Sequence, residues 1–295
     1  MLLACLGNAF MGLFAKLLSL HMSTIEVVFF RNGLGALFII YQIYSYNRSK
    51  NAKKESAKPG GRMLLLLFRG LIGTISLYFF FYNIANMPLG TAFVFHKTSP
   101  LFIALIAFFL LKERMKGFAV LGLLISFAGV LFLLSPSADI ELKQLCFGLA
   151  NGLLAAIALS SVRELSRFYS TQAIVLSFFG SGAIISALLM IFSEFVDAKT
   201  VQNYDFAFGI FVLPSGILWL YIALMAVFSI IFQVFMTKSF ALASKTGVVA
   251  GISYIDVPAS LILGLFLGDA LPGLVLVIGA LLVLAGSLLL SLNQK

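Results

Sequence analysis

The sequence predicts an all-α membrane protein in which ten transmembrane helices form two inverted five-helix repeats. The first observation behind this prediction is the composition: of 295 residues, 61% are hydrophobic and 11% are charged, and the mean hydropathy is +1.09. Soluble domains are about 45–50% apolar and about 25% charged. Ten helices of about twenty residues would occupy roughly two thirds of the chain, which excludes a large soluble catalytic domain. The other two observations are ten apolar segments and a pattern that occurs twice.

A window of about nineteen residues finds the ten apolar spans in order along the chain. The first five are residues 2–19, 27–44, 63–83, 91–111 and 118–134. The second five are residues 145–162, 173–192, 217–236, 247–267 and 271–292. The sixth span is the weakest because it lies between Lys143 and Arg163. The first span has no basic segment before it and no small-residue cleavage site, so it is predicted to be a transmembrane helix rather than a signal peptide.

Basic residues are distributed unevenly among the loops that join these spans. Threading the spans alternately through a bilayer places 14 of the 20 Lys and Arg residues on one side, whereas the opposite loops contain only Lys143 and Lys199 beside six acidic residues. By the positive-inside rule both termini are predicted to be cytoplasmic, and the even number of spans agrees. The net charge of +9 is therefore a topology signal and does not indicate a nucleic-acid partner.

One pattern occurs in both halves of the chain. It consists of a proline inside a span, an apolar run, an acidic residue and, four positions later, a glycine followed by a second apolar run with another glycine. The residues are Pro100, Glu113, Gly117 and Gly129 in the first half and Pro258, Asp269, Gly273 and Gly286 in the second. Each copy is five spans long, and an odd number of spans turns the second copy upside down relative to the first. Inverted repeats of this kind are typical of alternating-access carriers.

The first half also contains Lys16 and the run Glu26-Val-Val-Phe-Phe-Arg31 before the repeated pattern. Together these features resemble the EamA-type transporters of the drug/metabolite transporter superfamily, over nearly the whole chain. The resemblance implies two EamA repeats, residues 1–135 and 145–292, in a ten-helix bundle of a bacterial inner membrane. Members of this family carry amino acids, nucleotide-like metabolites, vitamins and drugs, so the resemblance implies a small metabolite without naming it.

Ionisable residues inside the spans are the best site candidates, because a charge there is costly and usually faces a bundle interior or a water-filled cavity. They are Lys16, Arg31, Arg69, His96, Lys97 and Asp256. At about 1.5 Å per residue, Asp256 lies near the midplane and the cationic residues other than Arg69 lie in the outer half. Arg69 is interpreted as a side chain that extends to the cytoplasmic interface. For Arg31, a structural pair with Glu26 and a role in the site are both open.

Two of these residues lie next to prolines in the middle of spans. Lys97 precedes Pro100 by three residues, and Asp256 precedes Pro258 by two. Proline has no N–H to donate to the carbonyl four residues earlier, so both helices are predicted to kink and to leave a free acceptor. In carriers, the substrate-binding site is usually formed by broken helices near the midplane of the membrane. The sequence therefore predicts a substrate site made of Lys97, Asp256, His96, Tyr254, Arg31 and Lys16.

A secondary carrier is the function that this pattern favours. The chain has no Walker-type segment and no loop long enough for an ATPase domain. The excess of buried cations indicates an anionic or zwitterionic substrate, such as an amino acid or a nucleotide-like compound. The alternative is a proton-coupled exporter of drugs or toxic metabolites that uses Asp256. A membrane-embedded enzyme is less favoured, since the chain has only two histidines and no acidic cluster, and a channel lacks the expected ring of carbonyls or charges.

The sequence predicts neither a metal site nor a cofactor. Cys5 and Cys146 lie in apolar stretches and belong to no Cys/His cluster, so they are interpreted as packing residues. The expected partners are a small-molecule substrate and the lipid bilayer. Motifs of the GxxxG type are too scarce to predict a dimer, and a homodimer is left open.

Overall fold

The structure, a computed structural model, describes residues 1–48, 60–109, 117–133, 140–196, 208–242, 253–270 and 273–292. The regular secondary structure of these residues is entirely helical, as the sequence predicts. The helices of the first half are α1 (Leu2–Ser19), α2 (Thr24–Arg48), α3 (Met63–Asn86), α4 (Leu89–His96), α5 (Ser99–Phe109) and α6 (Gly117–Leu133). Those of the second half are α7 (Leu142–Phe168), α8 (Thr171–Ser193), α10 (Leu218–Leu242), the 3₁₀ turn η2 (Ser253–Ile255), α12 (Asp256–Phe266) and α13 (Leu274–Leu292).

Helix length separates the spans into two groups. In the described part of the chain, α1, α2, α3, α7, α8 and α10 contain apolar stretches long enough to cross a bilayer. The helices α6, α12 and α13 contain shorter apolar stretches, and the predicted span 91–111 is divided between α4 and α5. The predicted span 247–267 begins at residues outside the described part. The total of ten spans therefore stays a prediction.

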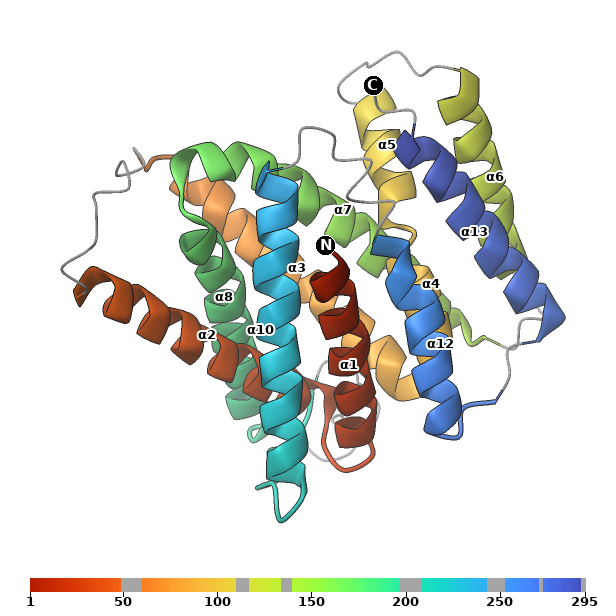
Figure 1. The fold of residues 1–295 in the computed structure, drawn as a ribbon. Helices are drawn as coiled ribbons and strands as arrows, with labels where there is room; N and C mark the ends of the chain where they lie inside the picture. Colours follow the sequence, from red (N-terminus) through yellow and green to blue (C-terminus); the bar gives the residue numbers. More distant parts are fainter. Residues whose placement is uncertain are drawn as a thin grey trace.

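The helices pack in pairs that link the two halves of the chain (Figure 1). Helix α1 of the first half packs against α10 of the second half. Helix α7, the predicted counterpart of α1, packs against α3, the predicted counterpart of α10. The pairs α2 with α8 and α6 with α13 each join a helix to its own counterpart. An inverted repeat would produce this exchange of partners. The repeat itself stays a prediction.

The helices α6 and α13, side by side in Figure 1, approach each other backbone to backbone. A Cβ placed on Gly129 would lie 2.6 Å from the backbone nitrogen of Val283, and one placed on Gly286 would collide with the backbone nitrogen of Ser126. Glycine at both positions allows the two backbones to touch, which is how helices associate where lipid offers no hydrophobic driving force. Larger residues would separate this pair.

The mid-span prolines begin helices rather than bend them. α4 ends at His96, and α5 begins at Ser99, so Pro100 lies in the first turn of α5. Pro258 likewise lies in the first turn of α12, after the 3₁₀ turn η2. Proline is accepted in a first turn because the N–H of that position has no partner within the helix. Each interruption places a helix terminus inside the bundle.

Candidate functional site

A buried ion pair lies between the two interrupted helices. Lys97 Nζ is 2.9 Å from Asp256 Oδ2, and the two side chains are only 7% and 1% exposed. Lys97 follows the C-terminus of α4, and Asp256 is the first residue of α12. A helix C-terminus favours a positive charge and an N-terminus a negative one, so each charge sits at the helix end that stabilises it. The two residues that the sequence places beside the prolines are thus in direct contact.

Asn8 on α1 completes this group. Its Nδ2 donates a hydrogen bond to Asp256 Oδ2 over 2.7 Å, and the residue is fully buried. The carboxylate therefore accepts from both an ammonium and an amide, as a charged group away from water requires. The sequence interpretation missed Asn8 because it considered only ionisable residues. An amide inside an apolar span was the available signal.

His96 lies beside the ion pair but makes different contacts. Its Nδ1 is 3.0 Å from Asn151 Oδ1 on α7, and its ring stacks on Phe80 with the centroids 4.5 Å apart. Asn151 Nδ2 in turn donates to the carbonyl of Ser76 over 2.6 Å. Asn8 and Asn151 therefore occupy similar roles, since each comes from the first helix of one half and contacts the helix interruption of the other half. The side chain of Tyr254 is outside the described part of the structure.

Two adjoining cavities lie next to these residues, and they share His96, Leu159, Phe232 and Met236 as lining residues. One also contains the side chains of Arg69, Ser76 and Gln233. The other contains Lys97, Ser99, Pro100 and Ser253. No acidic residue lines either cavity in the described part of the chain. The cavities are therefore apolar spaces with basic and neutral polar groups in their walls.

Arg31 does not pair with Glu26, so that structural alternative is wrong. The fully buried Arg31 donates from Nη1 to Asn32 Oδ1 over 2.7 Å, and its guanidinium lies over the rings of Phe178 and Phe179. Glu26 Oε1 instead accepts a hydrogen bond from the backbone N–H of Val212, in the segment before α10. A spacing of five residues places two side chains on different faces of a helix, which explains the separation.

Arg69 does not extend to the membrane interface, which corrects the sequence interpretation. The residue is only 3% exposed, its Nη1 donates to the carbonyl of Ile174 over 3.2 Å, and its guanidinium lies over the ring of Phe178. Arg69 does lie near one end of α3, as expected, but its side chain is on the face of the helix that points into the bundle. Gly70 marks that face, because a Cβ there would lie 2.7 Å from a backbone oxygen of α8. Arg69 therefore belongs to the cavity wall.

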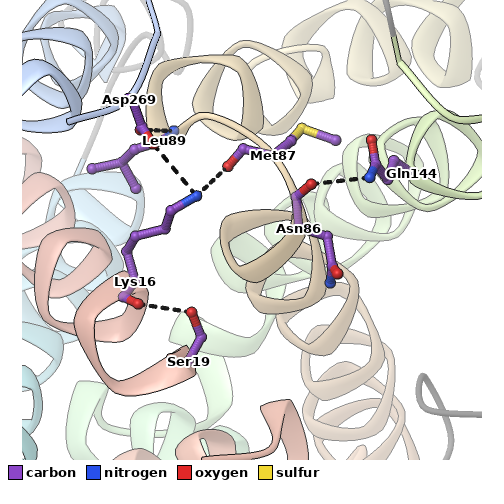
Figure 2. Close-up of polar contacts among 7 residues, drawn as sticks. All are labelled: Lys16, Ser19, Asn86, Met87, Leu89, Gln144 and Asp269. Carbon is purple, nitrogen blue, oxygen red and sulfur yellow. Dashed lines mark hydrogen bonds and ion pairs between the residues drawn. The ribbon is translucent and has the colours of Figure 1, made fainter. Parts of the chain in front are cut away.

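Lys16 belongs to a second group at another level of the bundle. Its Nζ donates to the carbonyl of Met87 over 2.6 Å and lies 3.6 Å from Asp269 Oδ1 (Figure 2). Asp269 Oδ2 accepts from the backbone N–H of Leu89, the first residue of α4, over 2.7 Å. We refer to Lys16, Met87, Leu89 and Asp269 as the Asp269 cluster. Asp269 thus caps α4, as is typical of an acid at the end of a span. Lys16 is separate from the group formed by Lys97, Asp256 and Asn8, which we call the central site.

The same end of the bundle has a further link between α3 and α7. Gln144 Nε2 donates to the carbonyl of Asn86 over 2.9 Å (Figure 2), and Asn83 Nδ2 donates to the carbonyl of Gln144 over 3.0 Å. Glu113, the predicted counterpart of Asp269, lies outside the described residues. Within the described residues, no group of three His, Cys, Asp or Glu side chains could hold a metal ion.

Comparison with known proteins gives one family and several relatives. The profile of the EamA-like transporter family matches residues 1–135. An uncharacterized transporter of Helicobacter pylori (strain J99) is 30% identical over 293 residues, covering 99% of this chain and 93% of that protein. The pseudopaline exporter CntI of Pseudomonas aeruginosa (strain UCBPP-PA14) is 28% identical, covering 99% and 95%. An S-adenosylmethionine uptake transporter of Rickettsia bellii is 23% identical, covering 100% and 92%.

Proposed function

The chain belongs to the EamA-like transporter family, and we propose that it is a secondary carrier that moves a small anionic or zwitterionic metabolite by alternating access. It is a multi-pass protein of a bacterial inner membrane. Like the relatives that are named as transporters, it is a transporter and not an enzyme. The alternating-access mechanism and the class of substrate are both inferred from the geometry of the central site.

The observation that carries the proposal is the Lys97–Asp256 pair beside the two cavities. The pair joins interrupted helices from the two halves of the chain, and interrupted helices near the midplane are the usual substrate scaffold of carriers. Lys97 lines a cavity whereas Asp256 lies behind it. A substrate that enters the cavity therefore meets the basic member of the pair first. This order favours a substrate with a carboxylate or a phosphate.

Closure at one end of the bundle supports alternating access. The cavities adjoin the N-terminal part of α3 and the C-terminal part of α10. Beyond the central site, at the opposite end of the bundle, the Asp269 cluster holds the turn before α4 against the end of α12. Within the described residues, two cavities thus lie on one side of the site, and the Asp269 cluster lies on the other side, next to a third cavity of about 230 Å³ between α4 and α12. A carrier must close one side while the other is open.

The loop charges supply the orientation in this proposal. The loop before α3 contains six of the basic residues, which places it in the cytoplasm under the positive-inside rule. The cavities then face the cytoplasm, and the Asp269 cluster closes the periplasmic side. The named relatives include both an exporter and an uptake transporter.

Counterflow in membrane vesicles tests the proposal. Metabolite profiling of cells with and without the gene first identifies compounds whose level changes. Vesicles that contain the protein and are preloaded with the unlabelled compound should then take up labelled compound faster than empty vesicles, because the loaded site returns more quickly than the empty one. Uptake should saturate with concentration. Lys97→Ala should abolish counterflow, whereas the matched variant Arg163→Ala, at an exposed arginine, should retain it.

Two outcomes would contradict the proposal. Flux that rises linearly with concentration and is indifferent to the opposite side would indicate a channel. Accumulation driven by a pH gradient alone, and lost in Asp256→Asn, would favour the alternative of a proton-coupled exporter. In the structure Asp256 already binds Lys97 and Asn8, so its use as a proton carrier would require a buried ion pair to break. That requirement favours the anionic or zwitterionic substrate.

A further inference from the structure

We propose that Arg69 forms an anion subsite in the cavity that it lines with Ser76 and Gln233. The subsite binds a carboxylate or phosphate group of the substrate, and Arg31, which lies behind Phe178, adds positive charge to it. This inference rests on the proposed function for the identity of the anion, but not for its binding. It concerns a residue that the sequence interpretation assigned to the membrane interface. Four features of the structure carry it.

The first feature is that two buried guanidinium groups have no acidic partner among the residues that the structure describes. Arg31 is 0% exposed and Arg69 is 3% exposed. Every ion pair to an Asp or Glu in the described part of the chain involves other basic residues, namely Lys16, Arg62, Lys97 and Arg167. An isolated charge away from water is costly, and proteins normally pair it or hydrate it. Two such charges in one region create a strong demand for a counter-ion.

The second feature is that both guanidinium groups converge on one ring. The central carbons of Arg31 and Arg69 each lie 5.3 Å from the centroid of Phe178. Contacts with an aromatic face partly compensate a cation without neutralising it. The two positive charges therefore reinforce one another around Phe178. An anion that contacts Arg69 is also attracted by Arg31.

The third feature is unused donor capacity. A guanidinium has five N–H donors. Nε of Arg69 and Nη2 of Arg31 have no hydrogen-bond partner among the described residues. Buried donors normally find a partner, and those that do not need a specific reason. Both atoms have almost no accessible surface, so they mark a shortage of acceptor atoms around the two guanidinium groups. An anion bound to the part of Arg69 that lines the cavity would relieve this shortage.

The fourth feature is access. Arg69 lines a cavity together with Ser76, His96 and Gln233. That cavity adjoins the one lined by Lys97, so an anion at Arg69 and a second polar group near Lys97 can belong to the same substrate. Arginine is the residue best suited to carboxylate and phosphate because its planar donors match two oxygens at once. The chemistry and the space therefore coincide.

Thermal stability of the purified full-length protein in detergent gives a test that needs no transport. Sodium phosphate and sodium acetate are titrated at constant ionic strength, with chloride as the balancing anion. At least one of the two should raise the unfolding temperature in a saturable way, because a ligand that binds only the folded state stabilises it. Arg69→Gln should raise the half-saturating concentration about 10-fold or more, since a buried charged hydrogen bond is lost. Arg163→Gln should leave it unchanged.

A second readout uses the unmodified protein, because Arg69→Gln can also weaken folding. Phenylglyoxal labelling of arginines is followed by peptide mass spectrometry. The stabilising anion should slow labelling of Arg69 and leave labelling of the exposed Arg163 unaffected. Failure of both anions to stabilise or to protect would overturn the proposal. Stabilisation by phosphatidic acid but by neither soluble anion would also overturn it, because the site would then hold a lipid headgroup.

The outcomes also separate this inference from the proposed function. Anion binding at Arg69 without counterflow would retain the subsite and remove the carrier mechanism. Counterflow that is unchanged in Arg69→Gln, with no anion effect on stability, would retain the carrier and remove the subsite. Loss of both binding and counterflow in Arg69→Gln, with normal protein in the membrane, is the expected result.

Discussion

Two ion pairs join the halves of the bundle, and they differ in burial and in partners. The Lys97–Asp256 pair is 2.9 Å long, less than a tenth of either side chain is exposed, and Asn8 binds the same carboxylate. The Lys16–Asp269 pair is 3.6 Å long with both side chains 15% exposed, and its other contacts are to the backbone around α4. The first pair is buried and is held by side chains. The second holds two turns together at the rim.

This difference determines what each pair can do during a transport cycle. When a buried pair loses one partner, the other charge stays in the interior without compensation, which is strongly unfavourable. A pair near the surface can exchange its partner for water at little cost. The central pair is therefore suited to respond to a charged substrate that replaces one of its partners. The Asp269 cluster is suited to open and close.

The largest expected effect is at the central pair. Asp256→Ala should reduce stability by about 3–5 kcal/mol, because the ammonium of Lys97 is left buried without a counter-charge. Unfolding of the detergent-purified protein measures this loss, and vesicle transport should be abolished. The double variant Lys97→Met with Asp256→Ala should recover stability, since an apolar replacement of a buried pair is often neutral or better, but it should not recover transport. A double variant that transports normally would make the pair purely structural.

The second largest effect should come from Asn8. Asn8→Ala removes one hydrogen bond to the Asp256 carboxylate and leaves the ion pair in place. A buried hydrogen bond to a charged group contributes about 1.5–3 kcal/mol, so the loss should be smaller than that of Asp256→Ala. The two single variants and their combination form a double-mutant cycle that measures this coupling. Additive losses would show that Asn8 acts independently of Asp256.

A smaller effect on stability is expected at the Asp269 cluster. Asp269→Ala removes the cap of α4 and the ion pair with Lys16, whereas Lys16→Ala removes the ion pair and the hydrogen bond to Met87 but keeps the cap. Loss of a helix cap costs about 0.5–2 kcal/mol. The clearer readout is access: in a protein with both native cysteines replaced by alanine, Thr91→Cys near this cluster should react faster with a membrane-impermeant maleimide when Asp269 is alanine. Equal labelling rates would show that the cluster does not hold the periplasmic side closed.

The smallest effect is expected from reporter fusions at the C-terminus, which show on which side of the membrane the cavities and the Asp269 cluster lie. A fluorescent protein fused to the C-terminus should fluoresce, and an alkaline phosphatase fused there should be inactive, because both termini are predicted to be cytoplasmic. The fusion is expected to leave stability and transport unchanged. An active phosphatase would reverse the orientation and place the Asp269 cluster on the cytoplasmic side.

Much of the fold follows from apolar patterning, which predicts the helical membrane architecture and the positions of the helices. The contact between Lys97 and Asp256 was also within reach, because two prolines at corresponding positions place both residues at interrupted helices. The face of a helix was harder to predict when its hydrophobicity is uniform. Arg69 was therefore assigned to the wrong surface, although Gly70 beside it indicated a close helix contact.

Asn8 and Lys16 show the remaining difficulty. They lie eight residues apart on α1, which is about 12 Å along a helix, and they belong to different polar groups. Charge alone selected Lys16 for the central site and passed over Asn8. In a membrane interior, an uncharged amide that is hydrogen-bonded to a carboxylate can contribute as much as a charge. Its partner comes from a residue 248 positions away, a distance that local patterns do not span.

The glycine contact between α6 and α13 limits which residues each of these helices can accept. Gly129 and Gly286 each belong to the apolar run that ends one copy of the sequence pattern, and each lies against the backbone of the other's helix. The two helices therefore depend on each other for the size of residue that they accept. A side chain added to either glycine would meet backbone rather than a flexible side chain, so the partner helix could not adjust by changing a rotamer. This contact is expected to accept only glycine on both sides, whereas the lipid-facing surfaces of the same helices can change freely.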